Sequence, residues 1–490
     1  MKRRTFCKST LAVGIAATLP GCSRESTPVD VGSTINAITG EGQELSIATT
    51  AVQEFGDALK GQLFLPDDSG YDSARMVWNG MIDKRPALIA QCHTSDDVVK
   101  AVSFASERNL LVSVKGGGHS FPGKSTCNGG IMIDLSQMHS TDVDVDNRTI
   151  RVDGGALLGH IDVAAQPHNL GTTTGIVSHT GVGGFTLGGG YGRTDRFMGL
   201  AIDNLLAANI VTASGEVLRA SADENPDLFW AIRGGGGNFG VATEFEFRLH
   251  PFKSTIYGGT AVFKLDAEFL RLYGELAAAL PDEASIEPQI RTEADGTSIV
   301  NLQLCYCGDL AMGEKVMAPV LKIAKPLSAD IGAMEYSVFQ TGADAYLGHG
   351  KQYYLKSGLV TGIAAELAEV IVDHMSRDKP VNSWMQHLGG APSLVAPDAM
   401  AYSHRSAALN LGIMVVSEDP AAMEGNIARA REFYKDAEPY MHGFYTNLNE
   451  DTDSKTWSNY GENYTRLVAA KDKYDPGNLF RLNANIKPSA

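Results

Sequence analysis

Three glycine-rich runs, at residues 116–118, 183–192 and 234–240, are the part of this sequence best suited to hold a large anionic ligand. Glycine lets the backbone approach a ligand closely and adopt positive φ angles without strain. Successive backbone N–H groups in such loops form concave sites that bind a pyrophosphate without a lysine. Several runs of this kind in one region predict loops that converge on one ligand.

His119 follows the first run directly, in the segment KGGGHS at residues 115–120. An imidazole nitrogen at the end of an anion-binding loop could join covalently to a carbon atom of a bound cofactor. A single histidine is more often solvent-facing or held by a structural hydrogen bond. The residue taken alone does not separate these alternatives.

Residues 118–125, GHSFPGKS, match the spacing of a P-loop. A P-loop needs a helix directly after it, because the N-terminus of that helix helps to bind phosphate. Here a glycine pair and a strand-like segment, 131–133, follow instead. The G-x-G-x-x-G pattern of nicotinamide-dinucleotide binding is also incomplete. Counted from Gly181, its third glycine is replaced by Thr186, and counted from Gly188, it is replaced by Arg193.

Hydrophobic patterns predict the elements that position these loops. A helix is expected to begin at Thr94, with Asp97 in its first turn. The predicted strands are 110–115, 130–135, 149–152 and 239–249, with a strand–turn–strand unit over 209–219. The other predicted helices are 157–165, 225–233, 365–375, 421–434 and 464–473.

The composition of the 490-residue chain indicates an ordinary globular protein of about two domains, with 43% hydrophobic and 20% charged residues. The net charge of −16 argues against nucleic acid as a partner. None of the six cysteines forms a C-x-x-C pair, so no metal site is expected. Cys305 and Cys307 would face the same side of a strand, where a disulfide would be strained, so we interpret them as buried apolar residues.

The first residues predict an export signal, with a charged start, a short apolar stretch over 11–19 and small residues before Cys22. The pair Arg3 and Arg4 is similar to a twin-arginine signal. Residues 19–22 resemble a bacterial lipobox, so a lipid anchor at Cys22 is an alternative to simple cleavage. We expect a protein that is periplasmic or lipid-anchored at the bacterial cell envelope.

The glycine runs belong to a longer series of ordered sequence blocks. The further blocks are DNL at 203–205, NPDLFWAIRGGGGNFGV at 225–241, YTN at 445–447, YGENYTRL at 460–467 and DPGNLFRLNANI at 475–486. Together they resemble the berberine-bridge-enzyme-like branch of the vanillyl-alcohol-oxidase, or PCMH-type, flavoprotein superfamily. The chain resembles bacterial members of the 6-hydroxynicotine oxidase type.

The resemblance implies an α+β fold, with a two-part PCMH-type FAD-binding domain and an inserted substrate domain on an antiparallel sheet flanked by helices. The sequence agrees, since tight glycine runs become rare after residue 256 and longer helical patterns appear. The expected division is an export signal and tether at 1–45, the FAD-binding domain at 46–255, the substrate domain at 256–440 and a C-terminal segment returning to the FAD domain at 441–490.

The same resemblance implies that FAD is the cofactor and that His119 bonds the 8α-methyl group of its flavin. It places five residues around the pyrophosphate: Gly116, Gly117, Gly118, Ser120 and Gly123. It places six further along the cofactor: Val177, Gly181, Gly183, Gly184, Gly188 and Val241. It places four on the isoalloxazine side: Tyr445, Asn447, Asn483 and Asn485.

Three positions depart from the family pattern. Val177 stands where many relatives carry a second flavin-linking cysteine, so a single covalent link is expected. Phe185 replaces a histidine of plant members, and Leu448 replaces a tyrosine that acts as the base in several members. The catalytic base is therefore unknown, and the candidates are His387, Tyr402, His404, Tyr191 and Tyr445.

The predicted function is that of an FAD-dependent oxidoreductase acting on a small alcohol, a carbohydrate or a nitrogen heterocycle. Thr180 occupies a position where relatives carry an oxygen-gating residue, and its small side chain favours an oxidase that passes electrons to O2 rather than to another acceptor. Two alternatives stay open: a surface lipoprotein that keeps the fold for binding alone, and nucleotide hydrolysis through residues 118–125.

Overall fold

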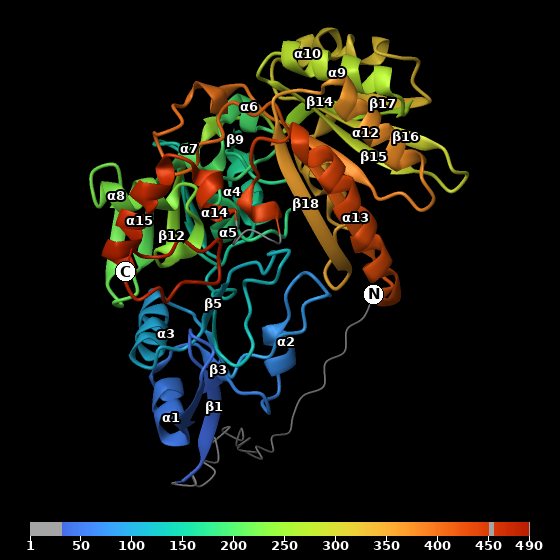
Figure 1. The fold of residues 1–490 in the computed structure, drawn as a ribbon. Coiled ribbons are helices and arrows are strands. Elements are labelled where there is room, and N and C mark those ends of the chain that lie inside the picture. The colour runs from blue at the N-terminus through green and yellow to red at the C-terminus, as the bar shows by residue number, and fades with distance from the viewer. Residues whose placement is uncertain (1–31, 450–454, 490) are drawn as a thin grey trace, which may run out of the picture.

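The computed structural model describes residues 32–449 and 455–489 (Figure 1). The expected export signal and Cys22 lie outside the described residues. Among the described residues, no helix combines the length and the apolar character needed to cross a bilayer. Helices and antiparallel sheets are both abundant, as the α+β prediction requires.

A four-stranded sheet near the N-terminus leads the chain into the first glycine run. Its order is β3 (Gln62–Phe64), β4 (Leu88–Gln91), β6 (Ile131–Asp134) and β5 (Val112–Lys115). β6 is parallel to both β4 and β5, and only β3 is antiparallel to its neighbour. The helices of this region are α1 (Thr49–Ala58), α2 (Tyr71–Arg75) and α3 (Ser95–Glu107). As predicted, Thr94 caps α3, with a reciprocal bond from Asp97.

The other two glycine runs lie around a five-stranded antiparallel sheet. Its order is β11 (Val217–Ser221), β10 (Leu205–Val211), β12 (Val241–Arg248), β8 (Thr149–Asp153) and β7 (Thr141–Asp144). Five helices accompany it: α4 (Leu158–Ala165), α5 (Val182–Leu187), α6 (Asp195–Met198), α7 (Ala201–Asn204) and α8 (Pro226–Ile232). A short ladder joins β9 (Leu170–Gly171) to β13 (His250–Pro251).

A seven-stranded antiparallel sheet forms the part expected to bind substrate. Its order is β17 (Ser328–Glu335), β14 (Thr255–Lys264), β16 (Ser298–Tyr306), β15 (Ala284–Thr292), β19 (Ser383–His387), β20 (Leu409–Ser417) and β18 (Gln352–Val360). Its helices are α9 (Ala267–Ala279), α10 (Leu310–Met317), α11 (Tyr336–Gln340), α12 (Ala365–Ser376) and α13 (Met423–Ala437). The domain boundaries at 256 and 440 stay predictions.

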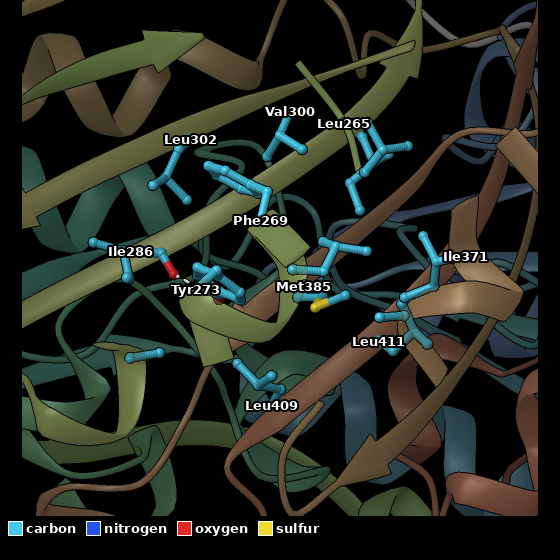
Figure 2. Close-up of a cluster of buried hydrophobic side chains, with 14 of the residues drawn as sticks. Leu265, Phe269, Tyr273, Ile286, Val300, Leu302, Ile371, Met385, Leu409 and Leu411 are labelled. Carbon is cyan, nitrogen blue, oxygen red and sulfur yellow. Dashed lines mark hydrogen bonds between the residues drawn. The ribbon is translucent and has the colours of Figure 1, made fainter. Parts of the chain in front are cut away.

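One face of this sheet is covered by α9, α12 and α13 and forms the largest hydrophobic cluster (Figure 2). Figure 2 shows Phe269 and Tyr273 of α9 reaching into the cluster, with the Tyr273 hydroxyl donating to the Ile286 carbonyl at 3.0 Å. On β15, Ile286 and Ile290 both belong to this cluster. Since side chains alternate along a strand, Glu287 and Gln289 point to the opposite face of the sheet, toward the FAD-binding part.

The C-terminal segment returns to the FAD-binding part, as the resemblance implies. It contains α14 (Thr456–Tyr460) and α15 (Asn463–Tyr474), and α15 lies beside α8 although more than 200 positions separate them in the sequence (Figure 1). All the helices and strands predicted from the sequence are confirmed, with end points that differ by a few residues.

The expectation that the tether extends to residue 45 is wrong. Residues Thr34–Ile38 (β1) and Glu44–Ala48 (β2) pair as a hairpin. The backbone of Ile38 accepts from Leu111 N at 2.9 Å and donates to Gly129 O at 2.8 Å, which fixes the hairpin to the first domain. The polar composition of this segment hid the alternation of exposed and buried side chains along its two strands, in which Ala37 and Ile47 are buried.

A buried ion pair holds the end of α15 in place. Lys471 and Asp475 have fully buried side chains, and Lys471 Nζ donates to Asp475 Oδ2 at 2.6 Å. The same ammonium donates to Asn238 O at 2.8 Å and to Phe480 O at 3.2 Å. The pair therefore connects the third glycine run to the C-terminal tail.

We expect Lys471→Met to lower the free energy of unfolding by about 3–5 kcal/mol, because it leaves the Asp475 carboxylate buried without its cation. The measurement is the urea midpoint of the purified variant. Lys473→Met is the matched control, since Lys473 makes an exposed pair with Asp227 that should contribute about 0–1 kcal/mol. Equal midpoints for the two variants would contradict the importance of the buried pair.

Candidate functional site

A cavity of about 760 Å³ lies where the three sheets and the C-terminal segment meet. All three glycine runs contribute to its wall, together with residues of β15, β16 and β19. Its size falls in the range of small-molecule and cofactor sites. His119 follows β5 at the carboxyl end of a parallel pair of strands, an edge where α/β sheets commonly bind ligands.

The first glycine run crosses the segment just before the second run at very short distance. A Cβ atom added to Gly117 would lie 2.4 Å from Gly181 N, and one added to Gly181 would lie 2.3 Å from Gly117 N. No side chain fits at either position, so glycine is required there for packing as well as for any ligand. A Cβ atom on Gly184, in contrast, would meet no protein atom within 4 Å and would project into the cavity space.

The third glycine run is tied to the C-terminal tail and, through it, to the loop that follows the first run. Asn238 donates to Ala484 O at 3.1 Å, and Asn483 donates to Gly237 O at 3.1 Å. Lys124 Nζ donates to Asn483 O at 2.8 Å. The wall, whose glycines carry no side chains, suits the phosphates and rings of a dinucleotide.

The imidazole of His119 is held on three sides. The Trp78 indole stacks on it, with ring centroids 4.6 Å apart and planes 18° apart. His119 Nε2 lies 2.6 Å from His179 Nδ1, and His119 Nδ1 lies 3.4 Å from Thr180 Oγ1. Each ring nitrogen therefore has its own partner, and the ring plane is fixed.

Burial, together with the neighbouring His179 and His349 rings, holds the pKa of His119 well below its usual range. The imidazole is therefore neutral at neutral pH, and one ring nitrogen keeps a free lone pair, as a nucleophile requires. Donor atoms of His119, His179 and His349 all lie within 4.8 Å of one another, close enough for a metal ion, although no metal site was expected from the sequence.

The predicted cofactor residues divide into two groups. Those that line the cavity are Gly116, Gly117, Gly118, His119, Ser120, Val177, Gly181, Gly183, Gly184, Val241, Tyr445, Asn447 and Asn483. Gly123, Gly188 and Asn485 are not among the residues that line the cavity. A Cβ atom on Gly188 would lie 2.2 Å from Asn447 Oδ1, so this glycine makes room for a lining residue.

Tyr191 and Tyr445 are the two candidate bases that line the cavity. The Tyr445 hydroxyl accepts from Gly190 N at 2.9 Å and from Asn447 Nδ2 at 2.8 Å. The Tyr191 hydroxyl forms a very short hydrogen bond with the Tyr402 hydroxyl. Burial raises the pKa of Tyr402, whose ring packs against the Arg405 guanidinium.

The candidacy of His387 and His404 is not supported by their positions. Both ring nitrogens of His387 are engaged inside β19, with Ile286 N at 3.3 Å and Ala277 O at 3.0 Å. Burial lowers the pKa of His387 to about 3. His404 binds Asn459 Oδ1 at 3.0 Å and borders a separate small cavity. Strand alternation explains His387, since it shares the helix-facing side with Met385.

The nucleotide-hydrolysis alternative is excluded by local structure. The next regular element after residues 118–125 is the strand β6, and the helix that a P-loop requires is absent between them.

Cys305 and Cys307 are not bonded; their sulfur atoms are 3.6 Å apart on one side of the strand, as expected.

Several residues in and beside the cavity were not predicted. Trp78, His179 and His349 come from loops with no distinctive local pattern, so only tertiary contact brings them to His119. Four others lie on the seven-stranded sheet and could have been found in the sequence, because they are polar residues inside otherwise apolar strands: Gln289, Asn301, Gln303 and Gln386. Arg193 also lines the cavity but lies outside the strands.

Comparisons with known proteins agree with this geometry. Residues 86–221 match the family described as FAD binding domain, and residues 445–487 match the family described as berberine and berberine like. The chain is 33% identical over 453 residues to an FAD-linked oxidoreductase of Dictyostelium discoideum, covering 90% of this chain and 98% of that relative. The chain belongs to the berberine-bridge-enzyme-like family of FAD-linked oxidoreductases.

Two solved structures of this family show the same fold. The 6-hydroxy-D-nicotine oxidase of Arthrobacter nicotinovorans matches with a TM-score of 0.82 at 29% identity, covering 88% of this chain and 99% of that chain. The glucooligosaccharide oxidase of Acremonium strictum, described with a 6-S-cysteinyl, 8α-N1-histidyl FAD, matches with a TM-score of 0.79 at 25% identity, covering 90% and 99%.

The berberine-bridge-enzyme-like chain is thus an FAD-dependent oxidoreductase. Membership of a family of enzymes favours turnover over a role in binding alone.

Proposed function

We propose that the chain is an oxidase that holds FAD by one covalent bond to His119. The observation that carries the proposal is the neutral, oriented His119 imidazole in the wall of a glycine-lined cavity. When bound, FAD accepts a hydride from a substrate carbon that carries O–H or N–H, and its two electrons then reduce O2 to hydrogen peroxide. The substrate classes of the named relatives, a nitrogen heterocycle and an oligosaccharide, are the starting candidates.

The neighbours of His119 support a single link. Val177 lines the cavity at the position where the resemblance places a second, cysteinyl attachment, and valine has no nucleophile. His179 Nδ1, 2.6 Å from His119 Nε2, can hold the proton at that nitrogen and leave Nδ1 as the bonding atom. With His119 committed to FAD, the three-histidine cluster has one ligand fewer for a metal.

Tyr191 is the residue best placed to take the substrate proton. Tyr191 lines the cavity, and its hydroxyl is joined to the Tyr402 hydroxyl, which can share the proton. Arg405, which forms a buried pair with Asp203, lies against the Tyr402 ring and offsets part of the rise in the Tyr402 pKa that burial causes. Tyr445 instead has its hydroxyl occupied by two donors and serves to position the Gly190 backbone.

Oxidase activity can be tested before a substrate is known. The flavin is reduced chemically without O2 and then mixed with aerated buffer. We expect rapid return of the yellow colour and one hydrogen peroxide per flavin, because the small Thr180 side chain leaves an approach path. Thr180→Leu should slow reoxidation and Thr180→Val should not. Slow reoxidation of the unmodified protein by O2, with fast reoxidation by quinones or dyes, would instead make it a dehydrogenase.

We further propose export through the N-terminal signal, with lipidation of Cys22. The support is the sequence pattern alone, since these residues lie outside the described residues. Fractionation of cells that produce the full chain tests it, because the unmodified protein should sediment with membranes and Cys22→Ser should be released. Recovery of the unmodified protein in the cytosol would contradict export.

A further inference from the structure

The wall of the cavity formed by the seven-stranded sheet is unusually polar. The residues of β15 that point away from the helices are Glu287, Gln289 and Arg291. Those of β16 on the same face include Asn301 and Gln303. Gln289, Asn301, Gln303 and Gln386 all line the cavity, and we call these four residues the amide wall.

The strand register makes the amide wall a continuous patch. Gln289 lies directly across from Asn301, and Glu287 directly across from Gln303. Directly paired residues have side chains about 5 Å apart at Cβ, so the carboxamides are immediate neighbours. Gln289 also pairs with Trp384 of β19, which places an aromatic ring beside them.

Polar atoms of this wall have no protein partner. Within residues 32–449 and 455–489, Asn301 Oδ1 and Gln303 Oε1 of the amide wall are buried and accept no hydrogen bond, and Arg193 Nε beside the wall donates none. All three residues line the cavity. A buried polar group without a partner is costly, so these atoms require hydrogen-bonding groups from water or from a ligand in the cavity.

Neighbouring contacts orient the wall before any ligand arrives. Asn410 Nδ2 donates to Gln386 Oε1 at 2.9 Å, which fixes the Gln386 amide. Arg193 Nη1 donates to Glu287 Oε2 at 3.1 Å. Among the described residues, no aspartate or glutamate lines the cavity. A protonated amine would therefore meet guanidinium and carboxamide groups and no free carboxylate at this wall.

Trp384 adds a flat apolar surface. Its indole lies so close to Gly412 that a Cβ atom there would be 2.3 Å from the ring. It also lines the cavity beside Met414. A ligand that suits this wall therefore presents several hydroxyl groups along one edge and an apolar C–H face against the indole.

We propose that the amide wall and Trp384 bind the hydroxyl groups and ring face of a neutral carbohydrate, the substrate of this oxidase. Each carboxamide both donates and accepts, as does each sugar hydroxyl. A flat heterocycle with one or two polar atoms would leave several wall groups unpaired, at a cost that strongly disfavours it. This inference rests on the proposed oxidase function, because it identifies the substrate class of that site.

The test uses flavin-loaded protein without O2 and a panel of neutral mono- and oligosaccharides beside 6-hydroxynicotine. At least one carbohydrate is expected to bleach the flavin, and 6-hydroxynicotine is not. Gln303→Met and Asn301→Leu, which keep side-chain size and remove the amide, should each raise KM for that carbohydrate by roughly tenfold. The control Gln53→Met, on the exposed face of α1, should leave KM unchanged.

Deoxy analogues of the active sugar sharpen the result. At least one deoxy analogue should bind the unmodified protein more weakly than the parent sugar does. A wall variant should bind the same analogue and the parent sugar equally well, since the variant has already lost the partner of the missing hydroxyl. Two variants are tested so that a folding defect in one does not decide the outcome. Bleaching by 6-hydroxynicotine but by no carbohydrate, or an unchanged KM in both variants, overturns the carbohydrate assignment.

Failure of the proposed oxidase function would look different. Reoxidation of the chemically reduced flavin by O2 needs no substrate and is measured on the same preparation. Normal peroxide formation together with a silent carbohydrate panel overturns the amide-wall proposal and leaves the oxidase intact. Absence of reoxidation by O2 overturns the oxidase, whichever substrates bleach the flavin.

Discussion

Replacing His119 with alanine is expected to remove all covalently bound flavin while leaving a folded protein that binds FAD reversibly. The glycine-lined wall does not depend on the imidazole, so its phosphate-binding contacts should persist. Only the bonding atom is lost. After acid precipitation, the unmodified protein should keep its yellow colour in the pellet, and the His119→Ala protein should release it to the supernatant.

A matched control is His168→Ala, because His168 is exposed in the turn after α4 and does not line the cavity. This control should keep flavin fluorescence on a denaturing gel at the level of the unmodified protein. Fluorescence retained by denatured His119→Ala would show that another residue carries the link and would overturn the single-bond assignment.

Tyr191→Phe is expected to lower the rate of flavin reduction by substrate by roughly 10²–10⁴-fold, the range typical for loss of a general base. The covalent link and the reoxidation of chemically reduced flavin by O2 should both survive, since Tyr191 contacts neither His119 nor Thr180. Rapid mixing of substrate with oxidised enzyme without O2 measures the reductive step alone.

The control for this variant is Tyr440→Phe, at a half-exposed tyrosine that follows α13. It removes the same hydroxyl outside the cavity and should change no rate. If Tyr191→Phe also keeps its full reductive rate, the proton goes elsewhere. Tyr445 would then be the remaining cavity-lining candidate from the sequence.

Local signals in the sequence predicted most of the fold because they reflect local physics. The Thr94 cap of α3 and the helix at 365–375 depend on contacts within a few turns, and both appear as expected. The hairpin at residues 34–48 was missed because its stability comes from bonds to Leu111 and Gly129 rather than from its own polar sequence. His387 was misjudged because a histidine in a strand faces either side with equal ease, and the register turned it to the helices.

The sequence alone indicated the cofactor, through the order of its glycine-rich blocks, and predicted His119 as the attachment point. Glycine is required where one backbone segment contacts another, and one histidine follows a glycine run. Both features depend on residue type and order, so they can be recognised without coordinates. Tertiary structure alone decided which side chains surround that histidine and which amides form one wall. Trp78, His179 and the pairing of Gln289 with Asn301 depend on how loops and strands from distant segments are brought together, and residue order does not encode such distances locally.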